Sequence, residues 1–296
     1  MAWIIFALGT LGAQFLVANW NRGQKLEPLR LNFWRSIPAL LCFSPAILFP
    51  NWPTDSDFYI ACIIIGICST FAQLATFHLS AKYNGRVSLI STNFAMLFTY
   101  ITWIVLDLET QTKYIELQPV ALISAALVIT AFGASFFMRQ KNRKEKEGYL
   151  FLSIVIGAII TIATIVGKKM LPEGLNEDLN EQLLILGFII FLSQWAFTSI
   201  LVILKRMRTG IPFFKSSEKY FCMRTVILGL LGAIGCFTSW GAVALAPNPA
   251  FVNAIVMTAP LIFLVYHKIL KVEDNANPIA GTIVALCALM IIIIQS

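Results

Sequence analysis

The side chains that could bind a ligand in this sequence are neutral and lie within long apolar runs. Amide groups occur there at Gln14, Gln73, Asn93 and Asn253. Burying an amide without a hydrogen-bond partner is costly, so each of these four residues is a candidate to face a polar cavity. Such groups suit hydrogen bonding to an uncharged or zwitterionic solute rather than the cleavage of a bond.

A second set of candidates adds hydroxyl, aromatic and imidazole groups. Trp240 follows a Thr-Ser pair and, with Tyr100, could stack on an aromatic or amphiphilic ligand, while His78 could titrate near neutral pH. Each residue also has a structural alternative, such as a hydroxyl bonded to its own helix or a packed indole. The predicted substrate-binding set is Gln14, Gln73, His78, Asn93, Tyr100, Thr238, Trp240, Asn253 and Tyr266.

The sequence offers no catalytic constellation. The six cysteines show neither metal-ligand nor redox spacing, and no phosphate-binding glycine loop or serine elbow occurs. All 15 acidic residues fall outside the apolar runs, so export of organic cations through protonation of a membrane carboxylate is not expected. We therefore predict no enzyme activity, no metal and no cofactor.

Composition places these candidates on membrane-spanning helices. The chain is 58% hydrophobic and 12% charged, whereas soluble domains carry about 25% charged residues. Runs of about 20 apolar residues span a bilayer as helices. The predicted all-α polytopic membrane protein has ten of them: Ala2–Trp20, Leu31–Phe49, Phe58–Leu79, Val87–Leu106, Pro119–Met138, Tyr149–Gly167, Leu183–Leu204, Cys222–Leu245, Ala250–Ile269 and Pro278–Ile294. We expect the first to remain as a helix rather than to be a cleaved signal peptide, because it lacks a basic start.

The basic residues predict which connections face the cytoplasm. The net charge is +7, yet every Lys and Arg can be assigned to a connection or a helix end, Arg35 included, so no nucleic-acid partner is expected. Nearly all lie in odd-numbered connections, and the even-numbered ones hold only Lys113, Lys168 and Lys169. This asymmetry predicts cytoplasmic odd connections and both termini on the other side. Abundant Ile, Phe, Asn and Lys are typical of proteins from AT-rich genomes, which favours a bacterial source and hence the bacterial inner membrane.

The chain divides into two similar halves. Residues 1–138 form a first set of five runs, 139–148 a basic cytoplasmic linker and 149–296 a second set. Leu79–Glu109 aligns without a gap on Val243–Glu273, with Glu109 over Glu273. Because five is odd, the second copy enters the membrane upside down, which predicts two inverted five-helix repeats.

Three prolines interrupt the second copy. Pro247 and Pro249 flank Asn248, which predicts a tight turn between helices eight and nine. Pro260 lies about ten residues into helix nine, where it removes a backbone hydrogen bond and can kink the helix. We predict a gating role for this kink, with a packed kink of no functional role as the alternative.

The segment from Ala250 to Ile294 resembles the second repeat of the drug/metabolite transporter superfamily, EamA-like branch. Pro260, Glu273 and Gly281 match its order of a proline in helix nine, a closing glutamate and a glycine in the last helix. Met96 stands where the first repeat often has its own proline. The resemblance implies a central cavity lined by helices 1, 3, 4, 6, 8 and 9, with 5 and 10 peripheral.

These observations predict a secondary transporter in the lipid membrane. Its small-molecule substrate would be polar or amphiphilic, with an amino acid or related metabolite favoured by the resemblance. The protein would transport this substrate by alternating access. The alternative cargo is a phosphorylated or nucleotide-linked sugar, which would need a deep basic residue. A polytopic membrane enzyme or a non-transporting scaffold is less favoured, and the coupling ion is left open.

Overall fold

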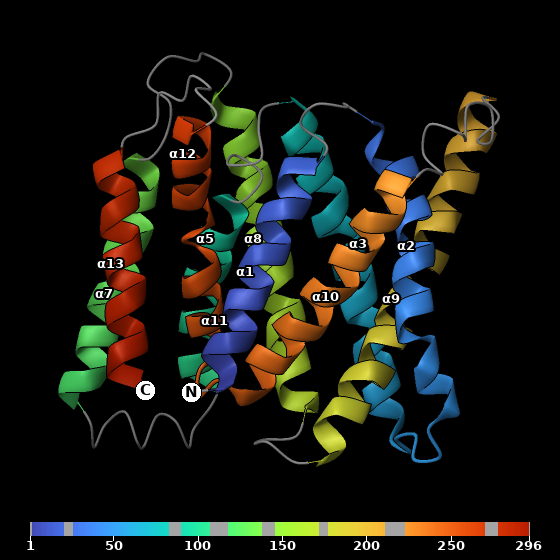
Figure 1. Ribbon diagram of the computed structural model, residues 1–296, viewed down its shortest axis with the longest axis horizontal. Helices are drawn as coiled ribbons and strands as arrows, with labels where there is room; N and C mark the ends of the chain where they lie inside the picture. Colours follow the sequence, from blue (N-terminus) through green and yellow to red (C-terminus); the bar gives the residue numbers. More distant parts are fainter. Residues whose placement is uncertain are drawn as a thin grey trace.

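The described part of the chain is built from helices and contains no strand (Figure 1). This computed structural model describes residues 2–20, 26–82, 90–106, 118–137, 146–171, 177–210, 223–269 and 278–295. The helices are α1 (Ala2–Trp20), α2 (Pro28–Phe43), the short 3-10 helix η1 (Ser44–Leu48), α3 (Ser56–Lys82), α5 (Ile90–Leu106), α7 (Gln118–Phe137), α8 (Lys146–Met170), α9 (Glu177–Thr209), α10 (Met223–Leu245), α11 (Pro249–Val256), α12 (Ala259–Ile269) and α13 (Pro278–Gln295).

The described part of each of the ten predicted runs is mainly helical, so the all-α class is confirmed. Five helical segments are long and apolar enough to cross a membrane: Pro28–Leu48, Ser56–Lys82, Phe151–Met170, Asp178–Thr209 and Met223–Leu245. Large apolar side chains such as Ile5, Leu41 and Phe151 are exposed on the outside of the bundle. These features fit an integral membrane protein. That the five shorter apolar helices also cross stays a prediction.

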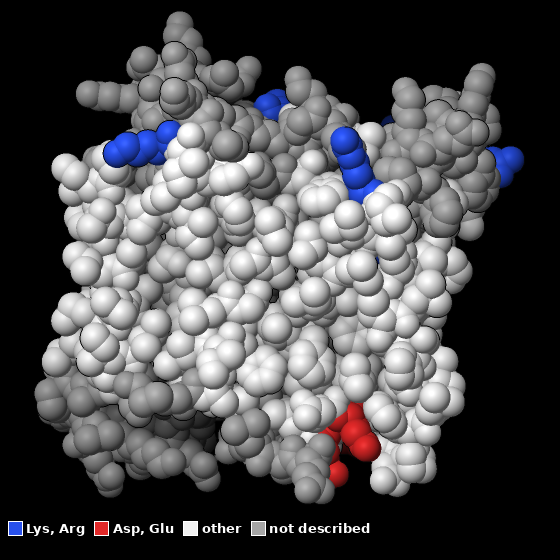
Figure 2. Space-filling model, in the orientation of Figure 1, with Lys and Arg blue, Asp and Glu red and all other residues white. Residues whose placement is uncertain are grey.

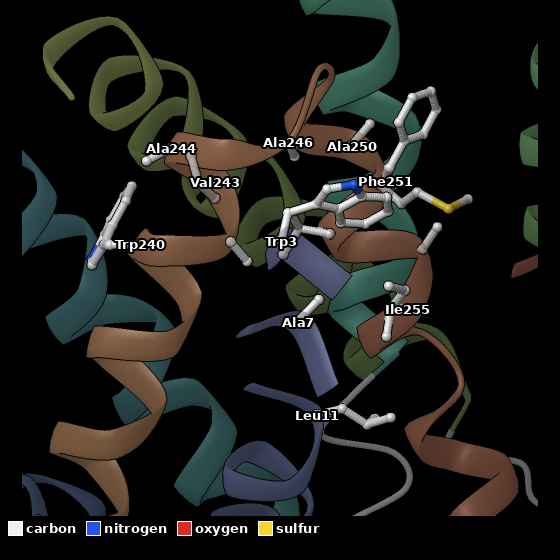
Figure 3. Close-up of a cluster of buried hydrophobic side chains, with 14 of the residues drawn as sticks. Trp3, Ala7, Leu11, Trp240, Val243, Ala244, Ala246, Ala250, Phe251 and Ile255 are labelled. Carbon is white, nitrogen blue, oxygen red and sulfur yellow. The ribbon is translucent and has the colours of Figure 1, made fainter. Parts of the chain in front are cut away.

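Helices of the two halves interleave in the bundle. Helix α1 packs on α10 and α3 packs on α8, while α2 contacts both α9 and α10. Helices α7 and α13 pair at one edge, and α2 and α9 lie at the opposite edge (Figure 1). Between these two edges, Trp3, Ala7 and Leu11 follow one another at helical spacing on α1, beside Phe251 and Ile255 of α11 (Figure 3). This apolar cluster joins the first helix to the ninth predicted run.

The turn between α10 and α11 forms as predicted. The side chain of Asn248 accepts a hydrogen bond from the backbone N–H of Ala250 at 2.9 Å, and Pro249 occupies the first helical position. Asparagine at the cap and proline just after it satisfy or remove backbone donors that would otherwise lack partners. The three residues 246–248 therefore reverse the chain with little exposed backbone polarity.

The ninth run is interrupted, as Pro260 predicts. Helix α11 ends at Val256 and α12 begins at Ala259, so two turn residues separate them. Because Pro260 has no N–H, the carbonyl four residues earlier loses its helical donor. The hydroxyl of Thr258 donates to the Ile255 carbonyl at 2.7 Å across the break. The first-half counterpart, α5, is continuous and has Met96 at the equivalent position.

Several sequence predictions fall outside the described residues. They are residues 139–145 of the basic linker, Glu109, Glu273 and the side chain of Pro260. For the described charges, Figure 2 shows Lys and Arg at the upper end of one face and Asp and Glu at the lower end, with an uncharged band between. In the same orientation both termini lie at the lower end (Figure 1).

Candidate functional site

A cavity of about 200 Å³ lies among the central helices of both halves. Its lining residues come from α1, α2, α3, α5, α8, α9, α10 and α11, and none of the described side chains of α7 or α13 is among them. The six central helices that the resemblance implies thus line this cavity, and α2 and α9 line it as well. Its wall includes the polar side chains of Gln14, Arg35, Gln73, Gln194 and Asn253 and the indole of Trp240.

Four of the nine predicted binding residues share this cavity: Gln14 of α1, Gln73 of α3, Trp240 of α10 and Asn253 of α11. Two of them carry buried polar atoms without a hydrogen-bond partner in the described structure, the Oε1 atom of Gln73 and the Nδ2 atom of Asn253. Buried amide atoms are rarely left unsatisfied in folded proteins. Water or a ligand in the cavity would supply the missing partners.

The other five predicted residues are not among those that line the cavity: His78, Asn93, Tyr100, Thr238 and Tyr266. Their participation in binding stays a prediction, but the structure gives several of them packing roles.

Three of these five residues join helices instead. The hydroxyl of Thr238 receives a hydrogen bond from Thr10 at 3.1 Å and so connects α10 to α1. Tyr100 is buried, and its ring centroid lies 6.5 Å from that of Phe251. Tyr266 packs edge-on against Phe15 at 5.6 Å, a favourable aromatic geometry. His78, by contrast, is exposed on α3, and Asn93 is buried on α5 but is not a lining residue.

The assignment of Arg35 to a connection is wrong. Helix α2 already begins at Pro28, whose fixed backbone angle suits the first helical turn. Arg35 therefore lies two turns into the helix, is only 2% exposed and lines the cavity. Its guanidinium carbon lies 5.1 Å from the ring centroid of Phe77, in cation–π contact. The cavity thus carries a positive charge that the sequence analysis placed in a connection outside the membrane-spanning helices.

Neutral amides and hydroxyls hold this guanidinium in place. The Nε–H of Arg35 donates to Oδ1 of Asn32 at 3.0 Å, and Nδ2 of Asn32 donates to the Thr198 hydroxyl at 2.9 Å. The side-chain amide nitrogen of Gln194 also approaches Asn32 Oδ1, at 3.4 Å, and the Thr198 hydroxyl donates to the backbone carbonyl of Gln194 at 2.7 Å. This buried network fixes the plane of the guanidinium by bonds between α2 and α9.

One pattern in the sequence could have indicated this network. Asn32, Arg35 and Ser36 stand at spacings of three and four, so a helix that includes them places all three on one face. Gln194 and Thr198 repeat the four-residue spacing inside another apolar run. Polar residues in such stripes within apolar helices mark faces turned toward protein or water rather than lipid.

Lys168 is also buried, at a helix end. It lies in the last turn of α8, and its Nζ donates to the carbonyl of Ala244 at 2.9 Å. Ala244 is in the last turn of α10, where carbonyls lack helical donors. Lys168 therefore caps α10, and its position at a helix end agrees with its assignment from the sequence.

Comparison with known proteins identifies a fold but no family. No protein-family model matches the sequence, and no curated protein matches it. Twenty-one chains of solved structures match the fold. One of them, described only as "Crystal structure of protein", aligns with a TM-score of 0.60 at 13% sequence identity, over 99% of this chain and 96% of that chain. At this identity the likeness concerns the fold alone.

Proposed function

We propose that this chain is a secondary transporter that moves a small polar or amphiphilic metabolite, with an amino acid or related compound favoured, across a bacterial inner membrane. The observation that carries the proposal is a cavity with polar walls, enclosed by helices of both halves, in a bundle whose outside is apolar. Alternating access around such a central site is the mechanism of transporters built from inverted repeats. The likeness to drug/metabolite transporters of the EamA-like branch is part of this proposal.

The helix pairings support two inverted repeats, 1–138 and 149–296. If the first to fifth runs correspond to the sixth to tenth, then α1 corresponds to α8, α2 to α9 and α3 to α10. Replacing each helix by its counterpart turns the α1–α10 contact into the α8–α3 contact, and the α2–α10 contact into the α9–α3 contact. The pairs α2–α9, α5–α11 and α7–α13 each map onto themselves. Such an exchange is the contact pattern that a pseudo-two-fold axis between the halves would produce.

Individual close contacts repeat in the same way. A side chain at Gly229 of α10 would meet Pro38 and the Arg35 carbonyl of α2, at 2.4 and 2.6 Å. A side chain at Gly66 of α3 would meet Ser193 and the Ile190 carbonyl of α9, at 2.7 and 2.9 Å. In each half, a glycine in the third helix thus lets it approach the second helix of the other half. By this correspondence Arg35 pairs with Ile190, so the buried cation has no counterpart in the second half.

The interruption between α11 and α12 supports movement around the cavity. Asn253 of α11 lines the cavity, and the break follows one turn later at Met257 and Thr258. Broken helices are typical of transporters, where they border binding sites and absorb changes of angle. Pro260 maintains the break because it cannot donate the missing hydrogen bond.

The alternative cargo, a phosphorylated or nucleotide-linked sugar, gains support from Arg35. Such a substrate requires a basic residue within the membrane-spanning part of the protein, and Arg35 is a buried basic residue that lines the cavity.

Solute flux tests the proposed function. The purified full-length chain, reconstituted in lipid vesicles, is expected to catalyse counterflow of at least one labelled solute from a panel of amino acids, related acids and phosphorylated sugars. Protein-free vesicles give the background. Absence of flux across the panel, together with turnover of lipid by the same preparation, would support a membrane enzyme instead.

A further inference from the structure

The guanidinium of Arg35 carries a charge that no acidic group balances in the part of the chain that the structure describes. Among the described residues, ion pairs join Glu27 to Arg30 and to Lys205, and none involves Arg35. Its side chain makes one hydrogen bond there, from Nε to the neutral amide of Asn32. A buried charge without an opposite partner is strongly unfavourable, so its terminal nitrogens need water or an anion.

A glycine allows the terminal nitrogens of Arg35 to lie close to α10. A side chain at Gly232 of α10 would meet the Nη1 atom of Arg35 at 3.0 Å, so glycine leaves the guanidinium room on the side toward α10. Arg35 and Gly232 both line the cavity. The Nε atom is held by Asn32 and one face of the guanidinium lies over Phe77, which leaves the Nη atoms as donors toward the cavity.

We propose that Arg35 is the anchor for an anionic oxygen group, a carboxylate or a phosphate, on the molecule that occupies this cavity. A planar guanidinium held in one orientation matches the paired oxygens of both groups. The charge of the anion would balance that of Arg35, which has no acidic partner among the described residues. This inference rests on the proposed function for the role of the occupant as substrate, and it narrows the substrate to an acid.

The remaining wall suits the rest of such a molecule. Gln73 offers an unpartnered acceptor and Asn253 an unpartnered donor, while Trp240 offers an apolar ring. An acid that also carries hydrogen-bonding and apolar groups would satisfy all of these. A molecule whose only charge is positive would be repelled by Arg35.

Binding can be measured separately from transport by thermal unfolding of the full-length chain in detergent. Four probes share a benzyl body and differ in head group: phenylacetate, benzylphosphonate, phenylacetamide and phenethylamine. We expect phenylacetate, benzylphosphonate or both to stabilise the wild type, and the amide and amine to have no such effect. The two acidic probes separate carboxylate from phosphate recognition.

Substitutions assign the effect to Arg35. Arg35→Gln should weaken binding of the acidic probe about tenfold or more, and Arg35→Lys by less, since it keeps the charge without the fork. Arg208→Gln removes an exposed positive charge from α9 and should leave binding unchanged. Should Arg35→Gln fail to fold, Gly232→Ala provides a second test, because its methyl group would lie 3.0 Å from Nη1 and the guanidinium would have to shift, which should also weaken binding of the acidic probe. Gly12→Ala, where a methyl group meets nothing within 4 Å, is its control.

Equal stabilisation of wild type and Arg35→Gln by the acidic probes would overturn the inference, as would stabilisation of the wild type by the amide or amine alone or by no probe. The proposed function can fail independently. Acid binding that depends on Arg35, without flux in vesicles, would contradict transport alone. Flux without any preference for acids would contradict the inference alone.

Discussion

Trp240 is the aromatic residue whose role the cavity distinguishes most clearly. Its indole lines the cavity, whereas Trp103 is buried elsewhere on α5. Because both truncations remove a large buried ring, their general cost in stability should be similar. We expect Trp240→Ala to reduce solute flux more than Trp103→Ala when vesicles contain equal amounts of folded protein. Equal losses would remove the reason to place the substrate against α10.

Lys168 tests the importance of a single buried cap. Removal of its side chain leaves the Ala244 carbonyl at the end of α10 without this donor. We expect Lys168→Ala to lower the free energy of unfolding by about 1–3 kcal/mol, the cost typical of an unsatisfied buried polar group. Lys169→Ala, at the exposed neighbouring position, is the control and should change stability little. Denaturant unfolding in detergent measures both, and equal effects would exclude the capping role.

At the residue scale, the sequence predicted amides that face the cavity better than it predicted charge. Gln14, Gln73 and Asn253 were identifiable because amides are rare in apolar runs. Arg35 was misassigned because it stands near the start of its run, where an arginine can equally belong to a connection. The distinction depended on where α2 begins, and Pro28 starts it three residues earlier than the apolar run suggests.

At the scale of helices, close crossings depend on single glycines. A side chain at Gly157 of α8 would lie 2.5 Å from Cβ of Phe94 and 3.0 Å from the backbone nitrogen of Ala95, both on α5. Backbone atoms cannot move aside cheaply, so Gly157→Ala should force the two helices apart. We expect a loss of about 1–3 kcal/mol in unfolding free energy, the range for overpacked cores.

Gly133→Ala on α7 is the matched control for this crossing, because a methyl group there meets nothing within 4 Å. It should leave stability unchanged or raise it slightly, since alanine is the better helix former. Thermal unfolding of the two variants in one detergent makes the comparison. If Gly157→Ala were as stable as Gly133→Ala, helices α5 and α8 would not be in the tight contact described above.

Helix positions were predictable because hydrophobic runs and prolines determine them locally. The interruption at Met257 and Thr258 follows from the missing N–H of Pro260, and the cap at Asn248 follows from its flanking prolines. The pairing of helices was less accessible. Contacts such as Asn32 with Thr198 join residues far apart in the sequence, and apolar periodicity does not identify the partner of each face.

For the whole molecule, the orientation in the membrane is a testable consequence of the charge distribution. Ser56 at the start of α3 and Thr209 at the end of α9 are exposed and lie at opposite ends of the bundle. In a background without the six native cysteines, we expect Thr209→Cys to react with an impermeant thiol reagent from the cytoplasmic side. Ser56→Cys should react only from the other side. Labelling of both from one side would contradict the proposed topology.

The lone guanidinium has an electrical consequence for a carrier. With a monoanion bound, the cavity would hold no net charge, so membrane voltage would have little effect on the conformational change that moves the loaded site from one side of the membrane to the other. The empty protein would retain the positive charge. Carrying one elementary charge through the full field is worth roughly 2.3 kcal/mol for about 100 mV. Membrane voltage would therefore act on the conformational change of the empty carrier, and through that step it would favour one direction of the transport cycle.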